Sequence, residues 1–572
     1  MRDKAKTRMD QERADEYEAS RTPRRKLIRR GTLLGMSILL MGLLVSACGD
    51  DDSADTTAAE AATTTAAEAT TTTAAEATTT QAPAELVTVR VGVNPTPAVG
   101  IEPVLINDEA GLAVFGQTAQ YLVFSDDELN AIPVLAESWE SNAAGDVWTF
   151  NIRQGVTFHD GTPLTAADVV ATFNGPIAEG NAASAYGTFG VSAGAAVALD
   201  ESTVQFTLDQ PSSAFPFFVS SDNYNSAILP ASFWADYAEG SYAQGGFNGT
   251  GPWINESYDP GVSAVYVKNP NYWGDNSNQP DRMEVTFFDT EAATVTAFQD
   301  DRLDVIHRIS ASGGLALIED SSNTVQSIST AQHRQIYFDT TTPPFDDKRV
   351  RQAMALMLDR QLLIDGLLGG FGTVGNDHPI WEFYPMYDSS AVAQREENLA
   401  EAQSLLDAAG YADGFTAALD TLSFNELEAL AQLVQSSAAQ LNNVNLEVGV
   451  YDAGTYYGDY WLAAQGSMGI VNYGHRGVPN VYLGAPLLSD GTWNASHWAN
   501  AEYDALFDQF VTAPDLDTQR GVAGQIQTLL NDEVPFIVPY YVDFISILKS
   551  DFSGFETTGM GHFDVVNSGF TG

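Results

Sequence analysis

The stretch "PVLAESWESNAAGDVWTFNIRQGVTFHDGTPLTAADVVATFN", residues 133–174, holds a compact series of local structure signals. Apolar residues alternate over 147–152, which predicts a half-buried strand. Asp160-Gly161 predicts a turn, and Thr165 with Asp168 three residues later predicts a capping box at the start of a helix. A catalytic His159–Asp160 pair is disfavoured, because adjacent side chains of an extended segment diverge. We therefore expect a strand, a turn and a capped helix.

Strands and helices are predicted along the rest of the chain as well. Alternating apolar and β-branched residues predict strands at 86–94 and 202–208. Helical spacing predicts helices at 346–360, 398–411, 501–510 and 516–534, with Gly410 as the stop of the second. The inward face of the helix at 346–360 is expected to hold Val350, Ala353, Met354, Met357 and Leu358. This mixture indicates α/β architecture.

The N-terminal residues have the pattern of an export signal. A basic segment at 21–30 precedes an apolar segment at 31–47, and Cys48, the sole cysteine, follows directly. "LVSAC" resembles the bacterial lipobox, which predicts a cleaved signal at 1–47 and a lipidated Cys48. The alternative is an uncleaved membrane anchor, for which the apolar segment is short. Residues 24–29 resemble a twin-arginine signal, so export by the Sec or the twin-arginine route stays open.

Charge and composition describe the part after the signal. The chain has 26 basic and 75 acidic residues; residues 1–47 hold 11 and 6 of them, which leaves 15 and 69, a net charge of −54. A basic patch for nucleic acid or anionic lipid is therefore not expected. Residues 49–85 repeat Thr, Ala and Glu with almost no bulky apolar side chain, which predicts a disordered tether from Cys48 to 85. No cysteine remains for a disulfide.

Motifs spaced along the whole body resemble one family. Residues 133–174 are similar to the signature of the extracellular solute-binding proteins of family 5, the peptide- and nickel-type receptors of ABC importers. The family's further motifs are matched in order by these segments: "GTGPW" at 249–253, "VKNPNYWG" at 267–274, "DDRLDV" at 300–305, "PPFDDKRVRQAMALMLDR" at 343–360, "EAQSLLDAAGY" at 401–411 and "VPFIVPYY" at 534–541.

The resemblance implies a type II periplasmic-binding-protein fold, with two lobes, hinge strands and an inserted subdomain. The expected first lobe is discontinuous, at 86–120, 247–335 and 534–572. The inserted subdomain is expected at 121–246 and the second lobe at 336–533. A ligand then sits between the lobes and favours the closed form.

The implied function is that of the substrate-binding component of an ABC importer. Such a protein captures a peptide or similar small polar solute and delivers it to permease and ATPase subunits. We expect a monomer without cofactor, lipid-anchored on the outer face of the cytoplasmic membrane or in the periplasm. An oligosaccharide, metal chelate or carboxylate solute is the alternative ligand. A surface sensor is the alternative role.

The binding residues are expected mainly in the segment 468–480. In peptide-binding members this segment carries a carboxylate that pairs with the peptide's amino group, whereas here it has none. Arg476 is the expected partner of a ligand carboxylate, with a structural salt bridge as the equal alternative. The other candidates are His475, Tyr473, Asn472, Trp461, Tyr457, Trp381, His378 and Trp493. For Tyr457 and Trp461 core packing is the alternative, and for His378, Trp381 and Trp493 it is an exposed loop.

An enzyme is the competing class of function. "GVSAG" at 190–194 fits the nucleophile elbow of serine hydrolases around Ser192. That elbow needs a buried strand before the serine and a helix after it, while the residues that follow Ser192 here predict strands. The separated histidines lack metal-ligand spacing. We therefore expect no catalytic turnover and no metal site.

Overall fold

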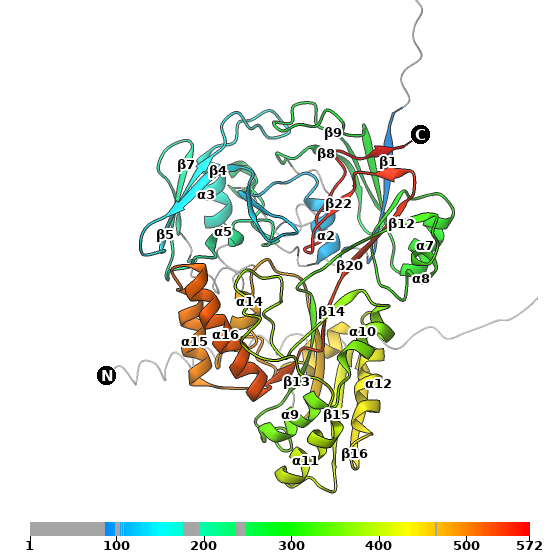
Figure 1. The fold of residues 1–572 in the computed structure, drawn as a ribbon. Helices are drawn as coiled ribbons and strands as arrows, with labels where there is room; N and C mark the ends of the chain where they lie inside the picture. Colours follow the sequence, from blue (N-terminus) through cyan, green and yellow to red (C-terminus); the bar gives the residue numbers. More distant parts are fainter. Residues whose placement is uncertain are drawn as a thin grey trace, which may run out of the picture. The chain divides into compact units, whose positions relative to one another are not determined.

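The computed structural model describes residues 86–571, apart from residues 96, 98–102, 104, 105, 107, 176–190, 193, 236, 238–247, 464 and 465. The predicted export signal, Cys48 and the tether lie outside the described residues. Within that part the expected α/β architecture is confirmed, with two seven-stranded sheets, a four-stranded sheet and helices that pack on them (Figure 1).

The first large sheet has the strand order β12-β20-β11-β1-β10-β9-β8. Its strands are β1 (Thr88–Val93), β8 (Trp253–Asp259), β9 (Ser263–Lys268), β10 (Arg282–Phe287), β11 (Val305–Ile309), β12 (Asn323–Ile328) and β20 (Phe544–Lys549). β1 runs parallel to both β10 and β11, and its alternating residues Val89, Val91 and Val93 are fully buried. Helices α7 (Glu291–Gln299) and α8 (Leu315–Ile318) pack on this sheet (Figure 1). The predicted strand at 86–94 is thus confirmed.

The four-stranded sheet includes two strands of the segment 133–174. Its order is β4-β5-β7-β6, with β4 (Ala136–Ser141), β5 (Val147–Ile152), β6 (Ala196–Ala198) and β7 (Thr203–Thr207). α3 (Ala166–Asn174) follows β5 and packs on β6 and β7. Edge-to-face aromatic contacts join Phe150, Phe173 and Phe206 between the sheet and this helix. Both strand predictions and the helix prediction are confirmed here.

The predicted turn and cap form with one difference. Gly161 has a left-handed φ of +86°, which suits glycine in the turn. Asp168 Oδ2 accepts hydrogen bonds from the Thr165 backbone N–H at 2.8 Å and from the Thr165 hydroxyl at 3.0 Å. The difference is that the hydroxyl also donates to the carboxylate, while both halves of the predicted capping box are present. His159 Nε2 lies 3.0 Å from the Gly251 carbonyl oxygen, which gives this histidine a structural partner.

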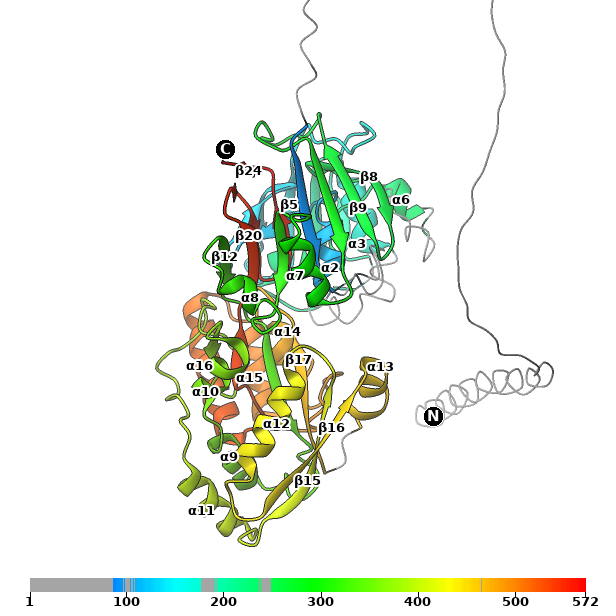
Figure 2. The same cartoon turned by 90° about the vertical axis from the view of Figure 1, so that its right-hand side faces the viewer.

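The second large sheet has the order β14-β19-β13-β17-β15-β16, with β18 paired to β13. Its strands are β13 (His333–Phe338), β14 (Gly372–Val374), β15 (Phe415–Leu422), β16 (Val444–Tyr451), β17 (Met468–Tyr473), β18 (Phe536–Ile537) and β19 (Tyr540–Val542). Helix α12 (Leu427–Ala438) lies along β15 and β16 (Figure 2). The other long helices between β13 and β18 are α9 (Lys348–Leu356), α10 (Arg360–Leu368), α11 (Leu399–Ala409), α15 (Ala501–Val511) and α16 (Leu516–Glu533).

The helix predicted at 346–360 is confirmed as α9, which ends four residues before the predicted end. α9 ends at Leu356, and α10 begins at Arg360 behind Asp359, which accepts the Leu362 N–H at 2.9 Å. Met357 and Leu358 are buried as predicted, although they lie in the connection between the helices. α11 confirms the helix at 398–411 and ends at Gly410 with φ +93°.

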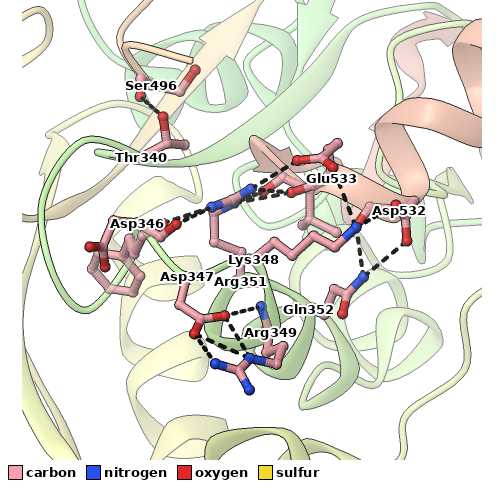
Figure 3. Close-up of polar contacts among 12 residues, drawn as sticks. Thr340, Asp346, Asp347, Lys348, Arg349, Arg351, Gln352, Ser496, Asp532 and Glu533 are labelled. Atoms are coloured by element: carbon pink, nitrogen blue, oxygen red, sulfur yellow. Dashed lines mark hydrogen bonds and ion pairs between the residues drawn. The ribbon is translucent and has the colours of Figure 1, made fainter. Parts of the chain in front are cut away.

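Polar contacts fix the start of α9 against the end of α16 (Figure 3). Lys348 Nζ lies 2.7 Å from Asp532 Oδ2. The buried Arg351 donates to the backbone carbonyl of Glu533 at 2.7 Å and to that of Phe345 at 2.8 Å. Backbone carbonyls accept these hydrogen bonds, so Arg351 joins α9 to the end of α16 and stabilises their packing.

The chain passes between the two large sheets at two places. One is the connection from β12 to β13, and the other is the connection from β19 to β20. The two connections are hydrogen-bonded together, since the Thr330 hydroxyl donates to the Val542 carbonyl at 2.7 Å and the Val542 N–H to the Gln332 carbonyl at 2.8 Å. β18 and β19, which the expected boundary at 534 assigns to the first lobe, pair in the second sheet.

Shorter elements complete the described part. The helices are α2 (Glu109–Phe115), α5 (Phe215–Phe218), α6 (Ala231–Ala235), α13 (Ala453–Thr455), the π-helical turn η3 (Tyr456–Tyr460) and α14 (Asn480–Gly484). The strand pairs are β2 (Val123–Ser125) with β3 (Ala131–Pro133), β21 (Phe552–Ser553) with β24 (Gly569–Phe570), and β22 (Glu556–Thr557) with β23 (Phe563–Asp564).

Candidate ligand-binding site

One pocket collects most of the predicted binding residues. This aromatic pocket has a volume of about 180 Å³ and is lined by Tyr457, Trp461, Val471, Asn472, Tyr473, Gly474, Arg476, Val481, Tyr482 and Trp493. The end of β17, the turn η3 and the start of α14 supply six of these ten residues, and the adjoining connections supply the others. Short segments within residues 457–493 thus place aromatic rings and one guanidinium around a small cavity, which is typical of ligand sites.

The aromatic rings are held in fixed mutual orientations. Tyr457 lies edge-on to Trp461, with ring centres 5.3 Å apart, and its hydroxyl lies 3.5 Å from Asn472 Oδ1. Tyr473 is buried, and its ring contacts that of Trp493 at 6.3 Å. Tyr457, by contrast, is 43% exposed. Tyr457 therefore offers ring surface to solvent or ligand, whereas Tyr473 forms the inner wall.

Arg476 is a buried cation placed by its neighbours. The Tyr384 hydroxyl donates to its backbone carbonyl at 2.6 Å. Its guanidinium carbon lies 5.1 Å from the centre of the Tyr224 ring, and Nη1 donates to the His475 carbonyl at 3.2 Å. Among the described residues, Arg476 forms no ion pair with a carboxylate.

Asp222 is a carboxylate near Arg476 that the sequence did not suggest. A β-carbon on Gly477 would lie 1.8 Å from Asp222 Oδ2, so the carboxylate packs directly on the main chain next to Arg476. Burial raises the pKa of Asp222 to about 7, while the charge of Arg476 acts in the opposite direction. Asp222 lies between α5 and α6, and only the tertiary fold brings it to Arg476.

Three predicted binding residues lie in the interior, outside the aromatic pocket. His475 Nδ1 accepts the Ala331 N–H at 3.0 Å, and Trp381 packs edge-on to its ring at 6.1 Å. His378 is buried, and its carbonyl accepts the Tyr541 hydroxyl at 2.8 Å. Burial lowers the pKa of His475 to about 3 and that of His378 to about 4, so both are neutral at neutral pH.

A second pocket was not anticipated from the sequence. This polar pocket has a volume of about 380 Å³ and is lined by residues of both large sheets and their loops, among them Asp289, Arg308, Arg334, Phe371, Glu426 and Asp543. The two pockets have no lining residue in common, but Arg334 of the polar pocket is the cross-strand partner of Asn472, which lines the aromatic pocket.

The serine motif lacks the geometry of a hydrolase. The Ser192 hydroxyl donates to Asp209 Oδ2 at 2.5 Å at an exposed position, and the next element is the strand β6. A nucleophile elbow needs a helix at that point. In the described ranges, no group of three or more His, Cys, Asp or Glu residues could hold a metal ion. None of the described helices combines the length and apolar character needed to cross a membrane.

Comparisons with known proteins give consistent matches. The family model of bacterial extracellular solute-binding proteins, family 5 (middle region), matches residues 130–495. The probable deoxycholate-binding periplasmic protein of Escherichia coli K12 is 24% identical over 482 residues, covering 80% of this chain and 88% of that protein. A di/tripeptide-binding protein of Pseudomonas aeruginosa is 25% identical over 463 residues, covering 75% and 83%. The fold is similar to that of the ABC transporter substrate-binding protein CtaP of Listeria monocytogenes, with TM-score 0.75, 21% identity and coverage of 85% and 99%.

Proposed function

This chain belongs to the bacterial extracellular solute-binding proteins of family 5, and from that membership we propose that it captures a peptide or similar small polar solute for an ABC importer. The relatives include proteins named for di/tripeptides and for deoxycholate, so membership alone leaves the ligand open. The ligand is bound, released to a permease and not chemically changed.

The observation that carries this proposal is the aromatic pocket with Arg476. Tyr457, Trp461 and Trp493 supply apolar ring faces, and Arg476 supplies a cation without a paired carboxylate in the described part of the chain. A buried guanidinium gains most from an anionic or strongly polar acceptor. We therefore propose that Asn472, Tyr473 and Arg476 contact a carboxylate or carbonyl group of the ligand. His475, His378 and Trp381 support these residues from behind.

Asp222 modifies what Arg476 selects. The segment 468–480 lacks a carboxylate, which favours ligands that do not need a free amino group. With a pKa of about 7, Asp222 is partly protonated at neutral pH and neutralises Arg476 incompletely. Arg476 therefore keeps a net attraction for an anionic group of the ligand.

A thermal-shift panel tests the proposal. The panel contains di- to penta-peptides, N-acetylated peptides, oligosaccharides and metal chelates. A ligand at 100 times its Kd stabilises the protein by about 2.7 kcal/mol, which gives a visible rise in Tm. Arg476→Ala should weaken binding of carboxylate ligands about tenfold or more, while the surface variant Arg349→Ala should bind normally. Failure of every solute to raise the Tm would contradict the function, and normal binding by Arg476→Ala would remove Arg476 from the site.

Placement in the cell and the lobe boundaries belong to the same proposal. We propose a monomer held at the membrane by a lipid on Cys48, after removal of residues 1–47.

The first lobe, which carries the inserted subdomain at 121–246, and the second lobe are best divided at the two connections between the large sheets. The pairing of β18 and β19 supports moving the late boundary from 534 to residue 543.

A further inference from the structure

The segment 474–477, which follows β17 in the proposed second lobe, packs against the inserted subdomain. A β-carbon on Gly477 would lie 1.8 Å from Asp222 Oδ2, so the carboxylate touches the main chain of this segment. The guanidinium carbon of Arg476 lies 5.1 Å from the centre of the Tyr224 ring. Asp222 and Tyr224 both belong to the inserted subdomain. Backbone and side chain of the second lobe thus meet the inserted subdomain directly.

The tip of the C-terminal hairpin, formed by β22 and β23, contacts the same segment from the first lobe. A β-carbon on Gly559 would lie 2.7 Å from Cγ and Nδ1 of the His475 ring. Met560 Sδ lies 4.0 Å from Arg476 Nη1. The His475 ring is itself fixed, because its Nδ1 accepts the Ala331 N–H at 3.0 Å. The hairpin tip therefore forms a second wall beside the segment.

The hairpin is bonded to the first lobe and the inserted subdomain. Gln117 Nε2 donates to the Phe563 carbonyl at 2.9 Å. His562 Nε2 lies 3.1 Å from the Ser221 carbonyl oxygen. In Figure 1 the red C-terminal segment at β22 accordingly lies beside α2. We therefore expect the hairpin to move with these parts of the chain when the lobes change their relative position.

Glycines make both contacts close. Neither Gly477 nor Gly559 has a positive φ, so the backbone conformation does not require glycine at these positions. The neighbouring atoms instead leave no room for a side chain there. Surfaces packed this closely fit one relative arrangement and separate when it changes, because packed interfaces have discrete states and do not deform continuously.

The chain passes between the two large sheets at two connections, so the contact of 474–477 with the other lobe is noncovalent and can open. We propose that this segment is the closing contact between the lobes, and that Gly477 and Gly559 are positioning residues for the closed arrangement. The socket that receives the segment consists of Ser125, Asp222, Tyr224, Gly559 and Met560. Because the segment carries Arg476, its entry into the socket also places a residue proposed to bind the solute. This inference rests on the proposed function and adds how the bound state is held.

Cross-linking across the contact tests whether it forms in solution. Asp222→Cys and Gly477→Cys in a Cys48→Ser background leave two thiols in the chain. A β-carbon on Gly477 would lie 2.7 Å from Asp222 Cγ, which is within reach of a disulfide. Oxidation with copper phenanthroline should therefore cross-link the pair. The rate, followed by mobility on non-reducing gels, rises with the fraction of molecules in which the contact exists.

A third substitution in the cross-linking pair separates the closing contact from general stability. Gly559→Ala should slow cross-linking about tenfold or more, because its β-carbon overlaps the His475 ring. Gly569→Ala is the matched control and should leave the rate unchanged, since a β-carbon there meets nothing within 4 Å. If Gly559→Ala does not fold, Tyr224→Leu takes its place. Loss of the ring beside Arg476 should slow cross-linking about threefold or more.

The cross-linked protein also shows whether the contact belongs to the bound state. The probe is an equimolar library of di- to penta-peptides, quantified by mass spectrometry. Peptides loaded before oxidation should stay bound through dialysis and leave after reduction, and protein cross-linked without peptide should take up none. If no peptide is retained, a solute that raises the Tm in the thermal-shift panel replaces the library.

Three results overturn the inference. They are the absence of a cross-link, an equal cross-linking rate in Gly559→Ala or its replacement Tyr224→Leu and in the Gly569→Ala control, and free exchange of solute through the cross-linked protein. A different result separates the inference from the proposed function. If the cross-link forms and Gly559→Ala slows it, while no solute of the panel binds, the contact between the lobes stands and the solute-binding function fails.

Discussion

At the scale of single residues, the most informative group is Asp222, whose raised pKa makes stability depend on pH. The folded protein holds a proton on Asp222 up to about pH 7, whereas the unfolded chain loses it near the ordinary aspartate pKa of 3.8. The folded state thus binds more protons between these values, and Asp222 costs stability as pH rises from about 4 to 7. Asp222→Asn should therefore raise the Tm at pH 8 and change it little at pH 4.

The size of this change in unfolding free energy follows from the difference between the folded and unfolded pKa values of Asp222. A difference of about three pKa units corresponds to about 4 kcal/mol as an upper figure. The measurement is the difference in Tm between Asp222→Asn and wild type at pH 4, 6 and 8, taken without ligand. A difference that stays constant across these pH values would mean that Asp222 ionises normally.

Ser192 provides a residue-level test of the expectation that the protein has no catalytic turnover. Its hydroxyl is bonded to Asp209 at an exposed position and is followed by a strand. We expect no labelling by a fluorophosphonate hydrolase probe, and identical solute binding by Ser192→Ala. Labelling that disappears in the variant would restore the hydrolase hypothesis.

At the scale of elements, the cap of α3 allows the contributions of Thr165 and Asp168 to stability to be compared. Asp168 accepts from the Thr165 N–H and hydroxyl and, through Oδ1, from the Ala231 N–H at 2.8 Å. Asp168→Ala leaves the backbone N–H groups of Thr165 and Ala231 unpaired and should lower the free energy of unfolding by about 1–3 kcal/mol. Thr165→Ala should lower it by about 1 kcal/mol or less. Urea denaturation measures the free energy of unfolding of both variants. Solute affinity should be unchanged, and a loss of affinity at constant stability would place this stretch in the site.

The helices and strands also show which parts of the fold local sequence patterns could predict. α3, α11 and β5 were predictable because their caps, stops and alternation act within a few residues. The end of α9 at Leu356 was missed, because Met357 and Leu358 continue the apolar spacing beyond it. For the site, segment 468–480 was traceable by resemblance. Asp222 was not, because it gains its role from partners distant in sequence.

At the scale of the whole molecule, the excess of acidic residues predicts a response to salt. The part after residue 47 has 69 acidic and 15 basic residues, so self-repulsion opposes the compact state. Raising sodium chloride from about 20 to 500 mM shortens the screening length from roughly 20 to 4 Å. We expect the Tm to rise by several degrees, and equally with choline chloride. A Tm that is flat or falls with ionic strength would show that the acids are already compensated within the fold.

The last prediction concerns how the molecule is held in place. Cys48 directly follows the apolar segment and is the sole cysteine, so any thioether-linked lipid must be attached there. One lipid with two acyl chains on its glyceryl group anchors stably, whereas a single chain binds only marginally. Wild-type protein should partition with membranes and show the added lipid mass on the peptide that begins at Cys48. Cys48→Ser should appear in the soluble fraction or as the unprocessed precursor, with solute binding intact because the described body begins at residue 86. A Cys48→Ser protein that is still processed and still partitions with membranes would contradict the lipid anchor and favour attachment through another part of the chain.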